Sequence, residues 1–183
     1  SEPQEIGVKL TERFLQTPHS HWGNIDGKNT PTLITYPDVC AWLGALWFTK
    51  GTNNEVLYNK LVDRFEPLFT SEKQMLPELR PKANNVVDWY VFGAVPFEIY
   101  RKNKDPKYLE LGLSYADNQW TLPENPNETE KSWHEKGYTW QTRLWIDDMF
   151  MITAVQAQAY LATGNKKYIN RAAEEMVLYL NSI

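Results

Sequence analysis

Residues 148–168 read DMFMITAVQAQAYLATGNKKY, which predicts a helix, a turn and the start of a second helix. Apolar side chains surround the first part on nearly every side, and this is typical of a helix that is buried on all sides. From residue 166 to residue 181 the apolar residues recur at intervals of three and four, as in an amphipathic helix with one face on the core. The stretch therefore predicts a hairpin made of an inner and an outer helix.

The same pattern occurs three times along the chain. An aspartate opens each copy, a small residue follows six positions later and a tyrosine follows twenty positions later. The three sets are Asp38, Gly44 and Tyr58; Asp88, Ala94 and Tyr108; and Asp148, Ala154 and Tyr168. Inner helices are expected at about 42–48, 91–100 and 150–161, and outer helices at about 54–66, 106–118 and 166–181, with a further outer-type helix at 5–16.

Turn residues support these boundaries. Gly51 and Gly164 are suited to the left-handed position that ends a helix, and Pro106 is suited to a first helical turn. On the last outer helix the predicted solvent side and the predicted core side differ clearly in composition. The solvent side has Glu174, Glu175 and Asn181, and the core side has Tyr168, Ile169, Ala172, Ala173, Met176, Val177 and Leu180.

Two stretches, 70–85 and 121–140, are rich in Pro, Asn and Glu and lack helical period, which predicts long loops. Each leads into an inner helix, so the beginnings of the inner helices, with Asp38, Asp88 and the doublet Asp147-Asp148, are expected at one end of the bundle. Loops of this length in a compact domain are usually functional. We predict an all-α fold and a single domain over residues 1–183, which forms roughly half of a six-hairpin α/α barrel and is part of a longer protein.

The composition narrows the function. The formal net charge is −4 and there is no basic cluster, which argues against nucleic acid and against an anionic membrane surface as partners. The chain has eight Trp, and aromatic side chains of this kind serve as core residues or as platforms for sugar rings. Cys40 lies among apolar residues and is expected to be buried. No apolar stretch is long enough to predict a membrane span, and an extracytoplasmic location would require an export signal that has been removed.

The clustered aspartates allow two interpretations. An aspartate at a helix start is first of all a capping residue, because its carboxylate accepts from free amides of the first turn. However, Asp147 and Asp148 are adjacent, so both cannot be the cap, and several aromatic and basic residues precede them. These are Trp133, His134, Tyr138, Trp140, Arg143 and Trp145. Carboxylates beside aromatic platforms, one His and one Arg would suit an acidic sugar.

Cofactor sites have little support in the sequence. Besides His134, the histidines are His19 and His21, which argues against a zinc cluster. There is no glycine-rich phosphate loop and no nucleophile elbow. We therefore expect neither a metal nor a cofactor.

Residues 144–151, LWIDDMFM, resemble the W-x-D-[TDN]-[LM]-[FY]-M motif of the unsaturated rhamnogalacturonyl hydrolases, glycoside hydrolase family 105. This family is related to the unsaturated glucuronyl hydrolases of family 88. The pair Trp133-His134, the following Tyr138 and the pair Val87-Asp88 resemble the same family. Its fold is a six-hairpin α/α barrel, in agreement with the repeat.

The resemblance implies an enzyme that hydrates the C4=C5 double bond of a terminal unsaturated uronic acid left by a polysaccharide lyase. The resulting hemiketal falls apart and frees the sugar. The same resemblance makes Asp147 the general acid/base and Asp88 its partner. It also implies that Trp145 stacks on the unsaturated ring and that His134 and Arg143 contact the substrate, an acidic oligosaccharide. Asp148 and Asp38 complete the predicted substrate-binding residues.

Three alternatives stay open at this level. The repeat aligns Asp148 with Asp38 and Asp88, whereas the motif selects Asp147 as the acid/base. The chain could also belong to another α/α-barrel sugar enzyme, an epimerase or an ordinary glycosidase, or to a helical-repeat interaction scaffold without chemistry. Taken alone, the 183 residues are expected to show little activity and to self-associate through exposed inner helices.

Overall fold

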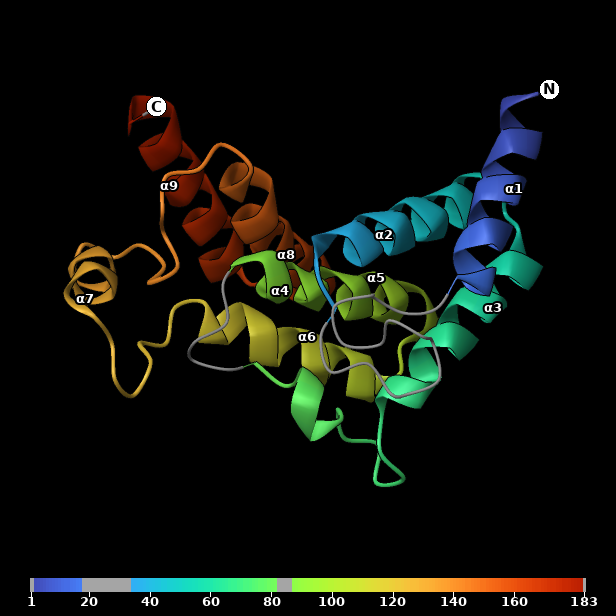
Figure 1. Ribbon diagram of the computed structural model, residues 1–183, viewed down its shortest axis with the longest axis horizontal. Helices are drawn as coiled ribbons and strands as arrows, with labels where there is room; N and C mark the ends of the chain where they lie inside the picture. The colour runs from blue at the N-terminus through green and yellow to red at the C-terminus, as the bar shows by residue number, and fades with distance from the viewer. Residues whose placement is uncertain (1, 18–33, 82–86, 183) are drawn as a thin grey trace. The chain divides into compact units, whose positions relative to one another are not determined.

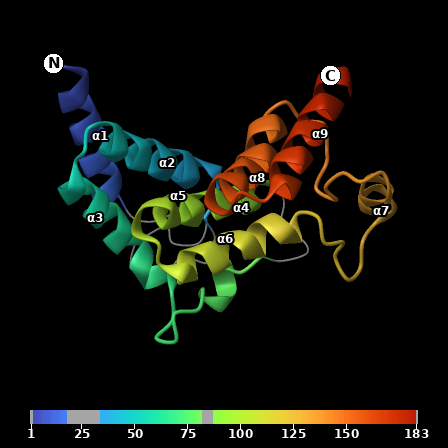
Figure 2. The ribbon, with the colours of Figure 1, turned by 180° about the vertical axis from the view of Figure 1, so that it is seen from behind.

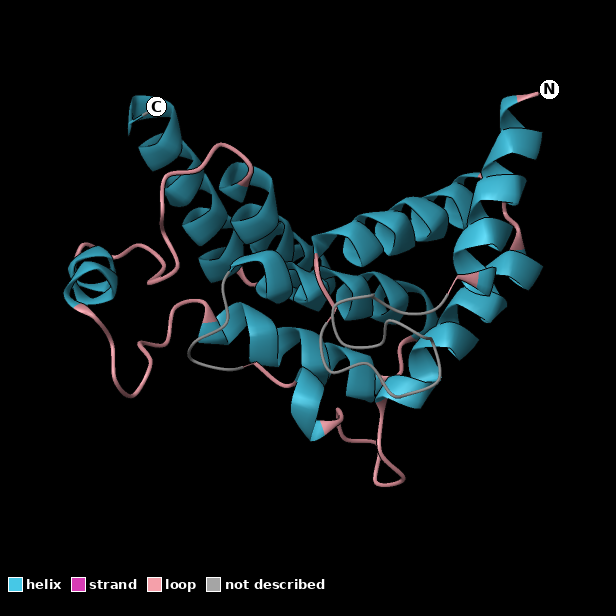
Figure 3. Ribbon diagram, in the orientation of Figure 1, coloured by secondary structure: helices cyan, strands magenta, loops and turns pink. Residues whose placement is uncertain are grey.

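The computed structural model describes residues 2–17, 34–81 and 87–182. The described residues form helices and loops, with one isolated β-bridge between Phe69 and Met75 (Figure 3). The all-α prediction is therefore confirmed. The chain divides into two compact units, Ser1–Arg80 and Pro81–Ile183. No helix in the described part of the chain is long and apolar enough to cross a membrane.

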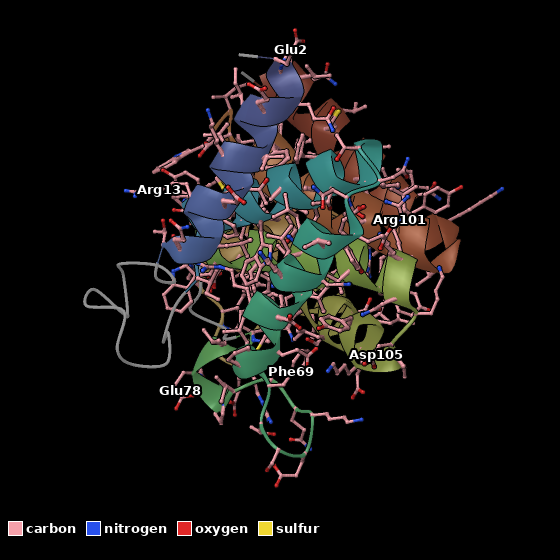
Figure 4. All side chains as sticks on the ribbon, turned by 90° about the vertical axis from the view of Figure 1, so that its right-hand side faces the viewer. Glu2, Arg13, Phe69, Glu78, Arg101 and Asp105 are labelled. Carbon is pink, nitrogen blue, oxygen red and sulfur yellow. The ribbon has the colours of Figure 1, made fainter. Side chains whose placement is uncertain are left out.

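The first unit contains three long helices that pack on one another: α1 (Pro3–Gln16), α2 (Tyr36–Gly51) and α3 (Glu55–Phe65) (Figure 1). Glu2 and Arg13 lie towards the two ends of α1 in Figure 4. Trp42 on α2 is fully buried, with its ring against Phe14 of α1 and Phe65 of α3. The three helices predicted for this part of the chain are therefore present.

The inner helix α2 is less enclosed than its composition predicts. One side of α2 is buried on α1 and α3, but Trp47 and Cys40 lie on its exposed side. The prediction of a buried Cys40 is therefore wrong, because its apolar neighbours in sequence do not cover it. Gly51 ends α2 without a left-handed backbone, which is adopted instead by Asn53, with φ 52°.

The second unit contains the helices that follow residue 86. They are α4 (Val87–Tyr90), the 3-10 turn η3 (Val91–Gly93), α5 (Ala94–Asn103), α6 (Pro106–Asn118), α7 (Glu128–Glu135), α8 (Asp148–Thr163) and α9 (Lys166–Ser182). The central helix is α8, which packs against α9, α5 and α6 (Figures 1 and 2). Pro106 begins α6, and Gly164 ends α8 with φ 71°, both as predicted.

The second inner helix is broken into α4, η3 and α5. Pro96 lacks an N–H and its ring displaces the carbonyl one turn earlier, which is a common cause of such a break. Gly93 lies at the break, where a Cβ atom would come within 2.4 Å of the Tyr115 Cβ on α6. The absence of a side chain at Gly93 thus lets the inner helix approach α6 closely.

The stretches predicted as loops contain short helices. The 3-10 turn η1 (Glu66–Leu68) precedes the first stretch, and the 3-10 turn η2 (Pro77–Leu79) lies within it. The second contains α7, so the prediction of a continuous loop from 121 to 140 is wrong. Asn127 and Glu130 form a reciprocal capping box that begins α7.

The buried face of α9 overlaps the predicted face only at Tyr168 and Ala172. Tyr168, Ala172, Glu175 and Tyr179 are its buried residues, whereas Met176, Val177 and Leu180 are exposed. The placement of Glu175 on the solvent side is therefore wrong. Tyr58, Tyr108 and Tyr168, the three repeat tyrosines, are all buried, as equivalent positions of a repeat should be.

Candidate active site

The aspartate doublet stands at the beginning of α8. Asp147 is the residue before the helix, yet its side chain makes no capping hydrogen bond. Asp148 is the first helical residue, and its carboxylate accepts from Arg143 and Tyr179. The interpretation of these aspartates as capping residues therefore holds for neither residue of the doublet.

Arg143 lies between three carboxylates. Its Nε donates to both carboxylate oxygens of Asp148 at 3.0 Å. Its Nη2 donates to Asp88 Oδ1 at 2.7 Å and lies 3.9 Å from Asp147 Oδ2. The guanidinium thus joins the start of α4 to the start of α8, as expected for Asp88 and the doublet.

The three carboxylates differ strongly in exposure. The side chain of Asp148 has no exposed surface, that of Asp88 is 32% exposed and that of Asp147 is 53% exposed. Burial raises the pKa of Asp148, although the Arg143 guanidinium and the Tyr179 hydroxyl oppose the shift. Asp147 is therefore the carboxylate of this set that a ligand reaches most easily.

Trp145 provides an aromatic surface next to the carboxylates. The Arg143 guanidinium lies over its ring, 4.2 Å from the centroid, in a cation–π contact. Trp145 is nevertheless 58% exposed, and the following Ile146 is 69% exposed. An exposed indole beside carboxyl groups is suited to stacking against a sugar ring.

Comparison with known protein families assigns the chain to one of them. Residues 8–182 match the sequence model of Glycosyl Hydrolase Family 88. The chain belongs to this family. The match covers both compact units, and the all-helical hairpins are consistent with part of an α/α barrel.

Family 88 membership makes the chain a glycoside hydrolase of the class that acts on unsaturated uronides. Family 88 is the relative of family 105 that was named with the motif resemblance. Assignment to family 105 itself stays a prediction. Searches among curated proteins and among solved structures give no match.

His134 is not grouped with these carboxylates. It lies near the end of α7, which stands to the side of α8 and α9 in both views (Figures 1 and 2). On the same segment the rings of Trp133 and Tyr138 meet edge to face, 6.1 Å apart. This segment is therefore a second aromatic region of the family 88 chain.

Asp38 belongs to the first unit. It lies in the first turn of α2, after the N-cap residue Thr35, so its predicted capping position is not observed. Its charge acts on Arg64 of α3, where burial lowers the pKa of the guanidinium and Asp38 opposes the shift. That Asp38 joins the substrate site stays a prediction.

No group of three or more His, Cys, Asp and Glu side chains arranged to hold a metal ion occurs among the described residues. His19 and His21, which the sequence analysis considered in relation to a zinc cluster, lie outside the described residues.

Sequence reasoning missed two buried residues of α9 that contact the segment before the doublet. Tyr179 donates to Asp148 Oδ2 at 3.1 Å, and Glu175 accepts from the Thr139 amide at 3.3 Å. Burial raises the pKa of the Glu175 carboxyl to about 7. The sequence does carry a signal for these two residues. Glu175 and Tyr179 are four residues apart and lie on the same helix face as the repeat tyrosine Tyr168.

Proposed function

We propose that the enzyme removes a terminal unsaturated uronic acid from lyase-generated oligosaccharides of the pectin and rhamnogalacturonan type. The family supports the uronide chemistry, and the motif LWIDDMFM favours the rhamnogalacturonan class. The observation that carries the proposal is a half-exposed aspartate, Asp147, placed with Asp88 around one guanidinium and beside an exposed indole.

In the proposed mechanism Asp147 protonates C4 of the unsaturated ring. A water molecule adds at C5 and returns a proton to Asp147, so the aspartate is restored and the C4=C5 double bond is hydrated. The hemiketal formed at C5 then opens, and the glycosidic bond breaks to release the sugar. Asp147 suits this role better than Asp148 because a general acid must reach the substrate, and Asp148 has no exposed surface.

The other residues support this step in different ways. Asp88 is held by Arg143 at 2.7 Å and serves as the partner carboxylate. Arg143 forms ion pairs with Asp88 and Asp148. We therefore propose that it holds these carboxylates in place and also contacts the substrate uronate. Asp148 acts through Arg143, and Trp145 stacks on the unsaturated ring.

The predicted contact His134 enters the proposal as an outer substrate contact. It lies on α7. It is not needed for the proton transfer itself, so replacing it by Ala should raise KM more than it lowers kcat.

The test follows the ultraviolet absorbance of the unsaturated uronate, which disappears on hydration. Full-length protein is mixed with rhamnogalacturonan-lyase products in one arm and with unsaturated glucuronyl disaccharides in the other. Loss of absorbance in the first arm at a higher kcat/KM supports the proposal. Faster loss in the second arm contradicts the glycan assignment, and no loss in either arm contradicts the uronide chemistry.

Asp147→Asn should lower kcat by about 100-fold or more, because the carboxyl group that moves the proton is gone. Asp117→Asn is the matched control, since Asp117 lies on α6 and pairs with Lys167 and Arg171 away from Arg143. This control should keep its activity. A larger loss in Asp148→Asn than in Asp147→Asn would contradict the assignment of Asp147 as the acid/base.

A further inference from the structure

Two polar side chains on the buried face of α9 have no exposed surface at all. They are Glu175 and Tyr179, which lie one helical turn apart. Burying a carboxyl group and a phenol is unfavourable unless both are hydrogen-bonded, so their partners indicate what they do. All of those partners lie between Thr139 and Asp148, the segment that leads into the proposed acid/base.

The Tyr179 hydroxyl holds the backbone at Arg143. It accepts from the amides of Arg143 and Leu144, each at 3.3 Å, and donates to Asp148 Oδ2 at 3.1 Å. The hydroxyl thus uses its proton and both lone pairs. Burial and the negative charge of Asp148 raise the pKa of Tyr179, so the phenol keeps its proton.

The residue held in this way has a strained backbone. Leu144 has φ 58°, in the left-handed region that a Leu rarely adopts. Such strain persists only where surrounding contacts enforce it. The Tyr179 hydroxyl supplies two of these contacts, and the resulting turn directs Arg143 towards Asp148 and Asp88.

Glu175 is hydrogen-bonded to the start of the same segment. The number of protons available to these hydrogen bonds indicates whether its carboxyl group is ionised. The Thr142 hydroxyl lies within hydrogen-bond distance of Glu175 Oε1 and of the Thr139 carbonyl oxygen. A carbonyl oxygen only accepts and the hydroxyl has one proton, so both bonds form together when Glu175 is protonated and donates to Thr142. Glu175 Oε2 meanwhile accepts from the Thr139 amide.

We propose that Tyr179 and Glu175 are positioning residues of this site: from α9 they fix the segment 139–144, and thereby place Arg143 between Asp148 and Asp88. Neither residue touches substrate. The effect on catalysis rests on the proposed function, whereas the effect on the backbone does not.

The first experiment compares Tyr179→Phe with Tyr168→Phe in the full-length enzyme. Each substitution removes one buried tyrosine hydroxyl from α9 that bonds an aspartate, Asp148 in one case and Asp117 in the other. In Tyr179→Phe we expect kcat to fall about tenfold or more and KM to change less than about threefold. In Tyr168→Phe both constants should stay near their wild-type values. A wild-type kcat in Tyr179→Phe, or an equal loss in Tyr168→Phe, would overturn the proposal.

The second experiment compares Glu175→Gln with Glu175→Ala. The amide of Gln donates to Thr142 and accepts from Thr139 as a protonated carboxyl does, so kcat should stay within about threefold of wild type. Glu175→Ala removes both hydrogen bonds and leaves the buried Thr139 amide without the carboxyl oxygen to which it donates, so kcat should fall about tenfold or more. Equal kcat in the two variants would contradict the role of Glu175.

Amide hydrogen exchange separates this proposal from the proposed function. Tyr179→Phe should speed the exchange of the Arg143 and Leu144 amides by about tenfold or more, and Tyr168→Phe should not. If the wild type hydrates no unsaturated uronide, the proposed function fails and this exchange result alone decides the positioning role. If the wild type is active and exchange is unchanged in Tyr179→Phe, the positioning role fails and the function stands.

Discussion

The outer helices α3 and α9 follow the same tyrosine register but bury different chemistry. On α3 the buried residues are Leu57, Tyr58, Leu61 and Phe65, a continuous hydrophobic face. On α9 they are Tyr168, Ala172, Glu175 and Tyr179, in which a carboxyl and two phenols replace most of the aliphatic surface. The helix that packs next to the acidic site is therefore the one with the polar buried face.

This difference separates two roles within one repeat. Apolar burial on α3 stabilises the fold through the area removed from water, and its contacts need little directional precision. The buried polar groups of α9 add little net stability, but each bond has a required geometry, so they specify one position of the adjoining segment. Changes on α3 should accordingly alter stability, whereas changes on α9 should alter pH response and catalysis.

The largest expected effect is on α3. Phe65 is fully buried, with its ring 5.2 Å from that of Trp42 and 5.5 Å from that of Phe69. Phe65→Ala should lower the free energy of unfolding by about 3–5 kcal/mol, because it removes a buried ring and leaves a cavity. Urea unfolding measures this change. Val56→Ala, at an exposed position of α3, is the control and should be nearly neutral, and a loss below about 1 kcal/mol for Phe65→Ala would contradict a tightly packed face.

The next effect concerns the pH response of α9. The pKa of Glu175 is about 7 in the folded chain, against an ordinary value of 4.5. The folded state binds this proton more tightly, so the stabilisation is fully present below pH 4.5 and is lost as the pH rises through about 7. The free energy of unfolding should fall by about 3 kcal/mol over this range on account of Glu175.

Glu175→Gln isolates that contribution. Gln keeps both hydrogen bonds and cannot ionise, so the variant should match wild type at pH 4.5 and exceed its stability at pH 8. The raised pKa of Asp148 acts in the same direction in both proteins, so the difference reports the Glu175 charge, including its repulsion by Asp148. Thermal unfolding at the two pH values measures it, and a variant less stable than wild type at pH 8 would count against a protonated Glu175.

Features fixed by local sequence were predictable. Helix α6 spans the predicted residues 106–118, because Pro106 begins it and its apolar period is continuous. The grouping of Asp88 with the doublet followed from the repeat. The capping box of α7 and the break before Pro96 also have local signals, Asn127 with Glu130 and the proline itself, which the search for helical period overlooked.

Features fixed by distant partners were not predictable. A helical wheel ranks Glu175 as a solvent residue, and its burial depends on Thr139, 36 residues away in the sequence. In the same way Arg143 was expected to bind substrate, whereas its position depends on Asp88, 55 residues away. Cys40 is the opposite case, a residue predicted to be buried that is exposed. Its apolar sequence neighbours do not indicate which side of α2 is covered.

The smallest expected effect tests which face of α9 stabilises the chain. Periodicity assigns Leu180 to the core, but it is 66% exposed, whereas Leu61 on α3 has no exposed surface. Leu180→Ala should therefore change the free energy of unfolding by less than about 0.5 kcal/mol. Leu61→Ala, the same substitution on the contrasting helix, should cost about 2–5 kcal/mol. Urea unfolding of both variants of the 183-residue chain makes the comparison.

A loss of more than about 2 kcal/mol in Leu180→Ala would mean that α9 packs through its apolar face. Glu175 and Tyr179 would then be turned away from Thr139 and Arg143, so this small effect bears directly on the polar contacts that separate α9 from α3.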